Sequence, residues 1–424
     1  MTGRAAWAAA AFLVLAGCVE QDGLKYSSVA LNAKPVTSGI GVPAVGGAPA
    51  ETPENVYALP NIAPGARPAV DTTEAGLWMM MDRAERQTMT AGNLVRDERL
   101  NAYVRGLVCK LAGPYCPDVR VYVRRVPAFN ANMAPNGMMN VWTGLLLRCR
   151  NEAQLATVLG HEIGHYLRRH SLQRMQDTIA TSNALIFVAL AAGAAGVPTA
   201  ADLAQLIAVG SLQAYSRDNE READAYGFKF LVANGYDPRE TAKVWDNLIA
   251  ERKADDDSPA RDVFFASHPP SDERSQTLST LAKKAMELEP NKDWNAGRDS
   301  YADAVLPHRA AFLRDDLQLR RFKPSEALIK SLIEDGVRVG ELRYFLGELY
   351  RMRNDKSDDK KALEAYEKAM TEEGAPPEIY RSLGLVKLAA KERDAAKNAF
   401  KKYLELAPNA PDAEVIKHMM ESRS

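Results

Sequence analysis

The chain has 424 residues, enough for two or three domains of ordinary size. Its 54 lysines and arginines nearly balance its 55 aspartates and glutamates, so no global positive field exists for a phosphate backbone. Apolar residues make up 46% and charged residues 26%, values that exclude a wholly disordered or collagen-like chain. We therefore expect a folded protein of more than one domain that does not bind nucleic acid.

Residues 1–17 have the features of a lipoprotein signal peptide. Arg4 precedes an apolar stretch from Ala5 to Val14, which is too short for a bilayer because a spanning helix needs about 20 residues. Leu15-Ala16-Gly17-Cys18 then resembles a bacterial lipobox, where cleavage leaves a cysteine that carries the lipid. We expect a periplasmic protein anchored through Cys18, and Val19 after the cysteine favours the outer membrane.

A flexible tether is expected over residues 18–71. The stretch from Pro35 to Pro68 contains seven prolines and five glycines, and few large apolar residues that could offset the entropy of ordering. From residue 72 the apolar pattern becomes helical, and we assign residues 72–305 to a folded domain.

This domain is expected to be α+β and mostly helical, with a small sheet. Residues 119–126 alternate as a strand should, and residues 138–147 give a second strand candidate. Asn151 is a plausible cap for one long helix over residues 151–176. The apolar run 184–197 is too short to cross a membrane, so we expect packed core or a surface that contacts lipid or an unfolded client.

Residues 306–424 have the spacing of tetratricopeptide repeats, in which large and small residues alternate so that two antiparallel helices can nest. The matching positions in two successive units are Leu346, Gly347, Tyr350, Ala362, Tyr366 and Ala369, then Tyr380, Gly384, Ala396, Phe400, Tyr403 and Pro408. The pattern predicts an α-helical repeat domain. An unrelated helical bundle is the alternative, because such spacings are common in helices.

Three cysteines remain after Cys18. Cys109 and Cys116 flank a turn that could bring them within reach of a disulfide bond, which would leave Cys149 unpaired. No Cys-x-x-Cys pair occurs, so neither a cysteine zinc site nor a thioredoxin-type site is supported.

The sequence His161-Glu162-Ile163-Gly164-His165 lies in the predicted long helix. Residues four apart share a helical face, so both imidazoles can bind one zinc ion while Glu162 accepts a proton from water. A catalytic zinc site has three protein ligands, so a third must be found. His170 follows His161 by nine residues, which places it half a turn off the ligand face, and we expect it to be exposed.

A downstream acidic helix offers the third ligand. Glu220 and Asp224 share one face, so one carboxylate could bind the metal while the other supports a histidine. Glu222 is the competing ligand if the helix is rotated, although it points roughly 160° away from the face of Asp224. The small residues Ala223 and Gly227 would allow this helix to approach the histidine helix closely.

Three ordered motifs together resemble the HtpX and CaaX-protease-type gluzincins. They are the His-Glu-x-x-His pair, the Glu-x-x-x-Asp segment, and a later His-Pro-Pro-Ser-Asp-Glu-Arg from His268 to Arg274. The likeness covers about residues 75–424 and is strongest to the periplasmic BepA-type branch, which joins a zincin peptidase domain to tetratricopeptide repeats.

This resemblance implies a site with one zinc ion per chain. Glu162 would be the general base, Asp224 would support a ligand, and the metal ligands would be His161, His165 and Glu220. It also implies a metalloendopeptidase that degrades misfolded or stalled envelope proteins in outer-membrane quality control, with repeats that contact the outer-membrane assembly machinery. The alternative is a chaperone or assembly factor that acts through its repeats while its metal site stays latent.

His268 precedes Pro269-Pro270, a stiff segment that can deliver it to a defined point. In similar proteins this loop either places its histidine on zinc as a fourth ligand or helps to stabilise the transition state, and Arg274 could stabilise an oxyanion. A simple helix cap is a third interpretation of His268. We also expect the strand at residues 138–143 to form the rim of the cleft and to offer its backbone to an extended substrate.

Overall fold

The computed structural model describes residues 61–181, 215–254, 264, 267–268 and 272–421. The predicted signal peptide, Cys18 and the apolar run 184–197 lie outside these residues. Within the described residues, no helix is both long and apolar enough to cross a membrane.

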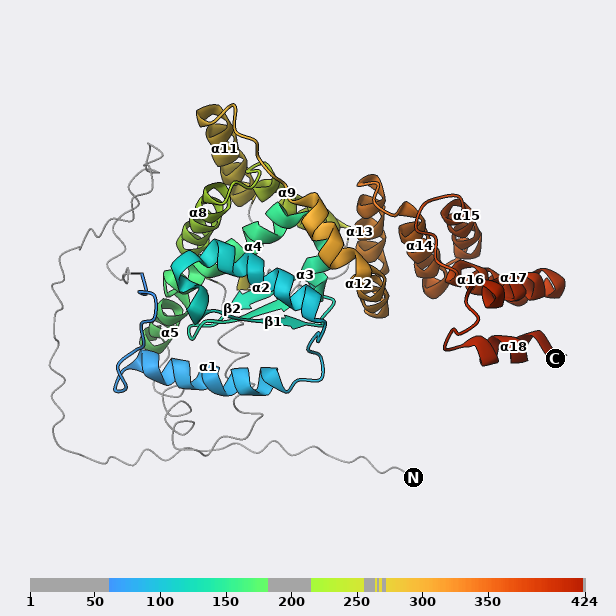
Figure 1. The fold of residues 1–424 in the computed structure, drawn as a ribbon, viewed down its shortest axis with the longest axis horizontal. Helices are drawn as coiled ribbons and strands as arrows, with labels where there is room; N and C mark the ends of the chain where they lie inside the picture. The colour runs from blue at the N-terminus through green and yellow to red at the C-terminus, as the bar shows by residue number, and fades with distance from the viewer. Residues whose placement is uncertain (1–60, 182–214, 255–263, 265–266, 269–271, 422–424) are drawn as a thin grey trace, which may run out of the picture. The chain divides into compact units, whose positions relative to one another are not determined.

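Helices dominate the described residues, and a small sheet accompanies them, as the sequence predicts (Figure 1). The strands are β1 (Arg120–Arg124), β2 (Ala131–Met133) and β3 (Met138–Trp142). The helices that accompany the sheet are α1 (Thr73–Met89), α2 (Glu98–Ala112), the short 3-10 helix η1 (Gly113–Asp118), α3 (Thr143–Arg148), α4 (Glu152–Leu167), α5 (His170–Thr181), α8 (Arg217–Ala233), α9 (Glu240–Lys253) and α11 (Asp272–Leu288). The later helices are α12 (Arg298–Gln318), α13 (Phe322–Glu334), α14 (Val339–Arg353), α15 (Asp358–Met370), α16 (Glu378–Ala389), α17 (Arg393–Leu406) and α18 (Ala413–Glu421).

The three strands are ordered β1-β3-β2, with β1 parallel and β2 antiparallel to β3. The second strand ends five residues earlier than predicted, because α3 begins at Thr143. Gly144 allows this turn: a Cβ at this position would lie 2.2 Å from the carbonyl oxygen of Ala128. The leucines that follow are therefore all buried on a short helix instead of alternating between two faces of a sheet.

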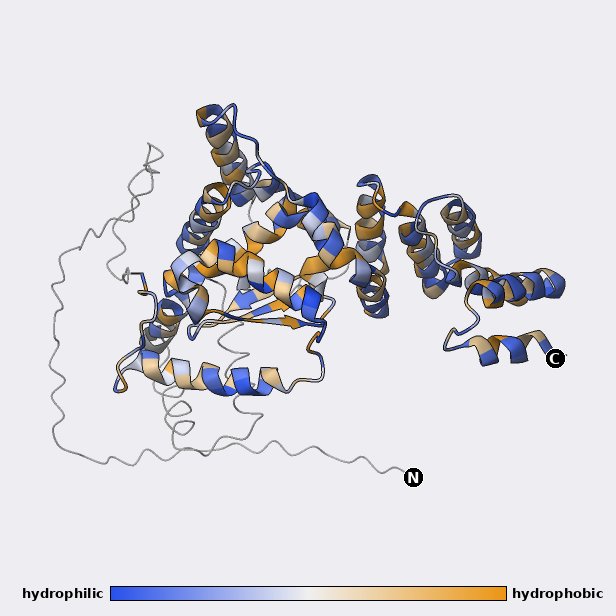
Figure 2. Cartoon of the chain, viewed as in Figure 1, coloured by the Kyte–Doolittle hydropathy of each residue, from blue (hydrophilic) through white to orange (hydrophobic). Residues whose placement is uncertain are grey.

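Helices cover both faces of the sheet (Figure 1). Helix α1 lies on one side, where Glu85 accepts hydrogen bonds from Arg120 at 2.7 Å and Tyr122 at 2.8 Å in β1, while α2 and α4 lie on the other side. Hydropathy colouring shows many hydrophobic residues along α4, whereas the strands mix hydrophobic and hydrophilic residues (Figure 2). This packing makes α4 the central helix of the domain, with residues 153–167 all buried.

The predicted helix over residues 151–176 is two helices. The expected cap at Asn151 is confirmed, because its side chain accepts a hydrogen bond from the Gln154 amide at 2.9 Å. Helix α4 ends at Leu167, and Arg169 adopts the left-handed conformation with φ 55° and pairs with Glu74 of α1. The chain therefore changes direction before α5 begins at His170.

Contacts with the folded body begin upstream of residue 72. Ile62 is buried and its amide donates to the Leu167 carbonyl at 3.1 Å, while the Gly65 amide donates to Asp118 at 2.7 Å. Residues 61–71 thus lie against the domain, although their composition suggests a tether. Backbone and side-chain groups both make these contacts, and composition does not reveal either kind.

The disulfide bond that the sequence permits between Cys109 and Cys116 is present in the structure. Cys109 and Cys116 form a disulfide bond with their Cα atoms 4.6 Å apart, and Cys149 is buried and unpaired.

Helix α12 spans residues 305 and 306, between which the sequence pattern places a domain boundary. Its Tyr301 hydroxyl donates to the Leu146 carbonyl of α3, and Phe312 and Leu313 are buried in the same apolar core as α4. The helix is thus continuous from the sheet-containing domain into the C-terminal helices.

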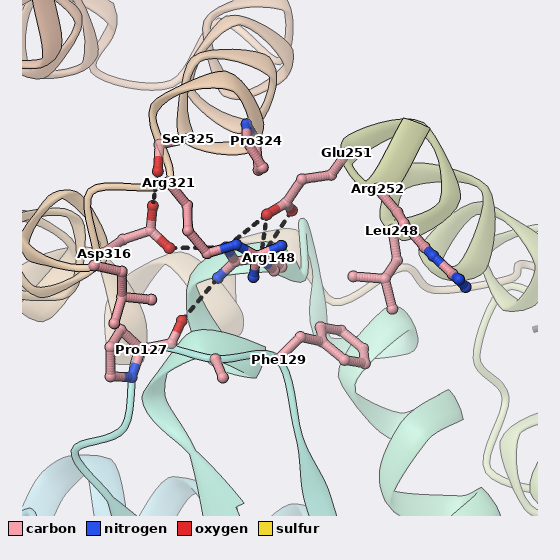
Figure 3. Close-up of a pocket in the computed structure, with 12 residues that line it drawn as sticks. Pro127, Phe129, Arg148, Leu248, Glu251, Arg252, Asp316, Arg321, Pro324 and Ser325 are labelled. Atoms are coloured by element: carbon pink, nitrogen blue, oxygen red, sulfur yellow. Dashed lines mark hydrogen bonds and ion pairs between the residues drawn. The ribbon is translucent and has the colours of Figure 1, made fainter. Parts of the chain in front are cut away.

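Buried ion pairs of Arg148 join three elements at this junction (Figure 3). Arg148 of α3 donates to Glu251 of α9 at 2.8 Å and to Asp316 of α12 at 2.8 Å. Asp316 also accepts from the Ser325 hydroxyl of α13 at 2.6 Å. The network ties α3 and α9 to the first C-terminal helices, α12 and α13.

Two successive helix pairs share one packing arrangement. A Cβ at Gly347 of α14 would lie 2.3 Å from the Tyr366 ring of α15, and a Cβ at Gly384 of α16 would lie 2.3 Å from the Phe400 ring of α17. In both pairs a glycine of the first helix accommodates an aromatic ring of the second. These are the small and large positions on which the repeat pattern depends.

Candidate metal centre

The paired histidines come together on the buried face of α4. His161 and His165 are one helical turn apart, and their Nε2 atoms lie 3.0 Å from each other. Both side chains are almost fully buried. Two imidazoles directed at one point inside a protein are the usual start of a metal site.

Helix α8 approaches α4 closely enough to bring a carboxylate to this point. A Cβ at Gly227 would lie 2.9 Å from the His161 backbone nitrogen, and a Cβ at Gly164 would lie 3.1 Å from the Cα of Ala223. The predicted close approach of the two helices is therefore confirmed. It places Glu220 Oε1 3.3 Å from His165 Nε2.

Four side chains form one buried donor cluster: His161, His165, Glu220 and His268. One ligand atom from each lies within 4.8 Å of all the others. His268 contributes Nδ1, which is 3.0 Å from Glu220 Oε1 and 3.3 Å from His161 Nε2. Each of the four is at most 2% exposed, so the cluster is closed to solvent in this conformation.

The donor set fits a zinc ion. Imidazole nitrogens and a carboxylate oxygen are ligands that zinc accepts in tetrahedral sites. Beside the cluster, Glu162 Oε1 is buried without a hydrogen-bond partner among the described residues and lies 3.6 Å from His268 Nε2. Burial raises the pKa of the Glu162 carboxyl above its ordinary value. A water or ion in the site would satisfy this oxygen.

Asp224 supports His161 from the side opposite the cluster. Its Oδ1 lies 2.9 Å from His161 Nδ1, so the ring presents Nε2 to the other donors. Burial would raise the pKa of Asp224, but the Arg274 guanidinium and His161 together outweigh burial and lower it. The carboxylate is thus held in its charged form, as support of a metal-binding imidazole requires.

Arg274 lies beside the cluster as a partner of carboxylates. Its Nε and Nη2 donate to Asp224 at 2.7 Å, and its Nη1 lies 2.7 Å from Glu220 Oε2. The guanidinium also lies over the Trp245 ring at 4.9 Å. These contacts favour a positioning role for Arg274 over the expected contact with an oxyanion.

Glu222 lies outside the donor cluster. Its oxygens are 2.7 Å from Arg168 Nε and 3.0 Å from His170 Nε2. The expectation that His170 is exposed is wrong: its exposed fraction is 0%, and its Nδ1 is 2.8 Å from His165 Nδ1. The reason is the break at Arg169, which redirects the chain so that His170 returns to the ligand histidines.

Aromatic rings enclose the cluster, and the sequence pattern does not identify them. Tyr215 stacks on His165 with ring centroids 4.0 Å apart, and Phe264 stacks on His268 at 4.6 Å. Phe264 could have been predicted to lie beside His268 from its position four residues earlier, which is one turn of a helix. The His268 amide donates to the Phe264 carbonyl as in a helical turn. No comparable spacing marks Tyr215.

The strand beside the site is β2, not β3. Strand β3 is paired on both edges, so its backbone is not free to bind a substrate, and the prediction for residues 138–143 is wrong. Strand β2 lies at the edge of the three-stranded sheet and packs against α4. A backbone hydrogen bond links Met133 of β2 to the Glu162 carboxylate.

Comparison with known proteins agrees with this geometry. Residues 94–282 match the sequence profile of Peptidase family M48, and this range contains all four donors and Glu162. The metalloprotease YcaL of Escherichia coli is 34% identical over 35% of this chain and 56% of its own length. The mitochondrial metalloendopeptidase OMA1 of Schizosaccharomyces pombe is 31% identical over 39% of this chain and 47% of its own length.

A third relative is similar over a larger share of the chain. The beta-barrel assembly-enhancing protease of Escherichia coli is 25% identical over 233 residues, which cover 52% of this chain and 46% of that protein. The chain spans about half the length of the curated relatives it matches.

The contact between α4 and α8 yields a test with a matched control. We expect Gly227→Ala to lower both metal affinity and the free energy of unfolding, the latter by about 1–3 kcal/mol, because its Cβ would push α8 away from His161. Gly106→Ala in α2 meets nothing within 4 Å and should instead stabilise by about 0.5–1 kcal/mol. Urea unfolding and metal titration of both variants provide the comparison. Unchanged metal affinity in Gly227→Ala would contradict this view of the helix contact.

Proposed function

We propose that this chain, whose residues 94–282 form a metallopeptidase domain of family M48, is a zinc-dependent endopeptidase that acts on misfolded or misassembled envelope proteins. The observation that carries the proposal is the buried donor cluster beside the Glu162 carboxylate, whose Oε1 atom has no hydrogen-bond partner among the described residues. A structural metal site needs four closed ligands but no additional base. The Oε1 atom of Glu162 has no hydrogen-bond partner among the described residues, so a purely structural role does not account for the burial of this oxygen.

Each side chain has a distinct part in the proposed reaction. The zinc ligands are His161, His165 and Glu220, and Asp224 orients the first of these rings. When bound, zinc acts as a Lewis acid that polarises the peptide carbonyl and lowers the pKa of water. Arg274 holds both acidic side chains of α8 in place.

Glu162 moves the proton. Its Oε1 is free to accept a proton from the attacking water, and the raised pKa of the carboxyl suits a group that must later return this proton to the leaving amine. The Met133 backbone contact holds the other side of the carboxylate toward β2. The proposed base therefore lies next to β2, the edge strand of the sheet.

The outer edge of β2 is the proposed docking strand for substrate. An extended peptide that paired with this edge would be bound through its main chain, and recognition would depend little on side-chain identity. Such recognition suits a protease of unfolded chains, which present many sequences in extended form.

His268 closes the site in the conformation described here. Its Nδ1 lies among the ligand atoms, so we assign it as a fourth ligand that must leave before a peptide carbonyl can approach. A simple helix cap does not explain a buried ring 3.0 Å from Glu220. The closed form would protect envelope proteins from unwanted cleavage.

The C-terminal helices are the proposed partner-binding region. Their repeated glycine and aromatic contacts support tetratricopeptide-like helix pairs, which commonly present a concave surface to other proteins. The similarity to the beta-barrel assembly-enhancing protease of Escherichia coli supports a role in outer-membrane quality control, with the outer-membrane assembly machinery as partner. We place residues 306–424 in this region, with the 72–305 region responsible for catalysis.

The catalytic assignment is tested by Glu162→Gln. This variant should bind one zinc ion per chain as the wild type does but lose at least about 100-fold of its activity on unfolded casein, because it lacks the proton acceptor. Zinc content by mass spectrometry and casein cleavage by gel are the two measurements. Equal cleavage by both proteins would contradict the assignment, and no cleavage by zinc-loaded wild type would favour the chaperone alternative.

The closing role of His268 predicts a gain of activity. His268→Ala should retain zinc, because three ligands remain, and should cleave casein faster than the wild type, because the coordination position is open. Initial rates with equal zinc loading measure this effect. A large loss of rate would instead assign His268 to transition-state stabilisation.

The proposed location is the periplasmic face of the outer membrane, with the lipid on Cys18 as the anchor. Cys18→Ala should move the protein from the membrane fraction to the soluble fraction and leave casein cleavage unchanged. Immunoblots of separated fractions measure the change. Retention of this variant in the membrane fraction would contradict the anchor.

A further inference from the structure

The two ligand histidines differ in what supports them: the first contacts a carboxylate, and the second contacts another histidine. His161 contacts a carboxylate directly through Nδ1, whereas His165 Nδ1 lies 2.8 Å from the Nδ1 of another histidine, His170. His170 Nε2 in turn lies 3.0 Å from Glu222 Oε2. The series Glu222–His170–His165 therefore ends at the donor cluster.

The order of protons along this series follows from chemistry. An imidazole that binds a metal through Nε2 must carry its proton on Nδ1, so His165 must donate to His170. His170 must then accept at Nδ1, which places its own proton on Nε2, directed at Glu222. Glu222 is a carboxylate and can only accept. Each contact in the series thus has one donor and one acceptor.

We propose that His170, oriented by Glu222, is a positioning residue that fixes the proton of His165 on Nδ1 and so directs its Nε2 lone pair into the metal site. The inference rests on the proposed zinc-dependent function. The reverse arrangement, with the His165 proton on Nε2, would remove a ligand from the cluster. Glu222 can only accept, so it keeps the proton of a neutral His170 on Nε2, and His170 Nδ1 then has no proton to donate to His165.

The far end of the series is fixed to the body of the protein. Arg168 at the end of α4 places Nε 2.7 Å from Glu222 Oε1, and its Nη1 donates to Asn61 at 2.8 Å. Glu222 is therefore held on both oxygens. The left-handed residue Arg169 stands between the two partners in sequence and produces the turn that makes the series possible.

The test compares substitutions that keep or remove the acceptor. Asn at position 170 offers Oδ1 in place of the imidazole Nδ1, whereas Leu offers no acceptor, so His170→Asn and His170→Leu form a matched pair. Glu222→Leu removes the acceptor at the next step from a side chain that is 38% exposed, so folding should survive. Asp218→Asn on the exposed part of the same helix is the control.

Zinc affinity is measured by chelator competition, independently of proteolysis. His170→Leu should lose roughly 10–100-fold in affinity, and Glu222→Leu should lose affinity in the same direction, because support of a ligand histidine typically has this effect. His170→Asn should recover most of the loss, and Asp218→Asn should match the wild type. In wild-type protein labelled with 15N-histidine and loaded with zinc, NMR should show the His165 proton on Nδ1.

Wild-type affinity in both His170→Leu and Glu222→Leu would overturn the proposal, as would a His165 proton on Nε2. Equal loss in the Asn and Leu variants would also overturn it, because it would show that packing rather than hydrogen bonding matters. Failure of the proposed function would look different. In that case wild-type protein would bind zinc with the predicted dependence on position 170 but would not cleave casein.

Discussion

The close contact between α4 and α8 is the constraint on which the rest of the site depends. Glycines on both helices remove the side chains that would separate them, and the carboxylate of Glu220 then reaches the two histidines of α4. Helix α4 is also the central buried helix of the domain, so the close-packed core restricts the movement of the two histidines that it carries. A metal site formed this way needs no flexible loop to bring three of its four donors together.

Helix α8 also carries the carboxylates that support the cluster on either side, with help from α11 and α5. Asp224, one turn after Glu220, holds the first histidine, and Arg274 of α11 pairs with both carboxylates. On the other side, Glu222 of α8 and His170 of α5 hold the second histidine. Asp224 and Glu222 of α8 thus support opposite sides of the donor cluster. The fourth donor, His268, comes from outside this pair of helices, which makes it the ligand best suited to leave.

Sequence reasoning predicted the parts of the site that depend on helical periodicity. The ligand pair on α4 and the facing acids on α8 follow from spacings of four residues, and the fold class follows from the same patterns. It failed where one backbone conformation decides the outcome: the left-handed Arg169 divides a predicted helix and buries a histidine expected to be exposed. It also missed β2, because three residues carry too little pattern to distinguish a strand from a loop. The pairing of Arg274 with α8 is long-range, and no local signal reports it.

The central claim is that one zinc ion is held where α4, α8 and His268 meet. Anomalous diffraction at the zinc edge from crystals of the wild-type protein tests this claim directly. We predict a single peak per chain, about 2.0–2.2 Å from His161 Nε2, His165 Nε2 and a Glu220 oxygen. A zinc peak bound by other residues, or no peak from protein crystallised with excess zinc, would contradict the account.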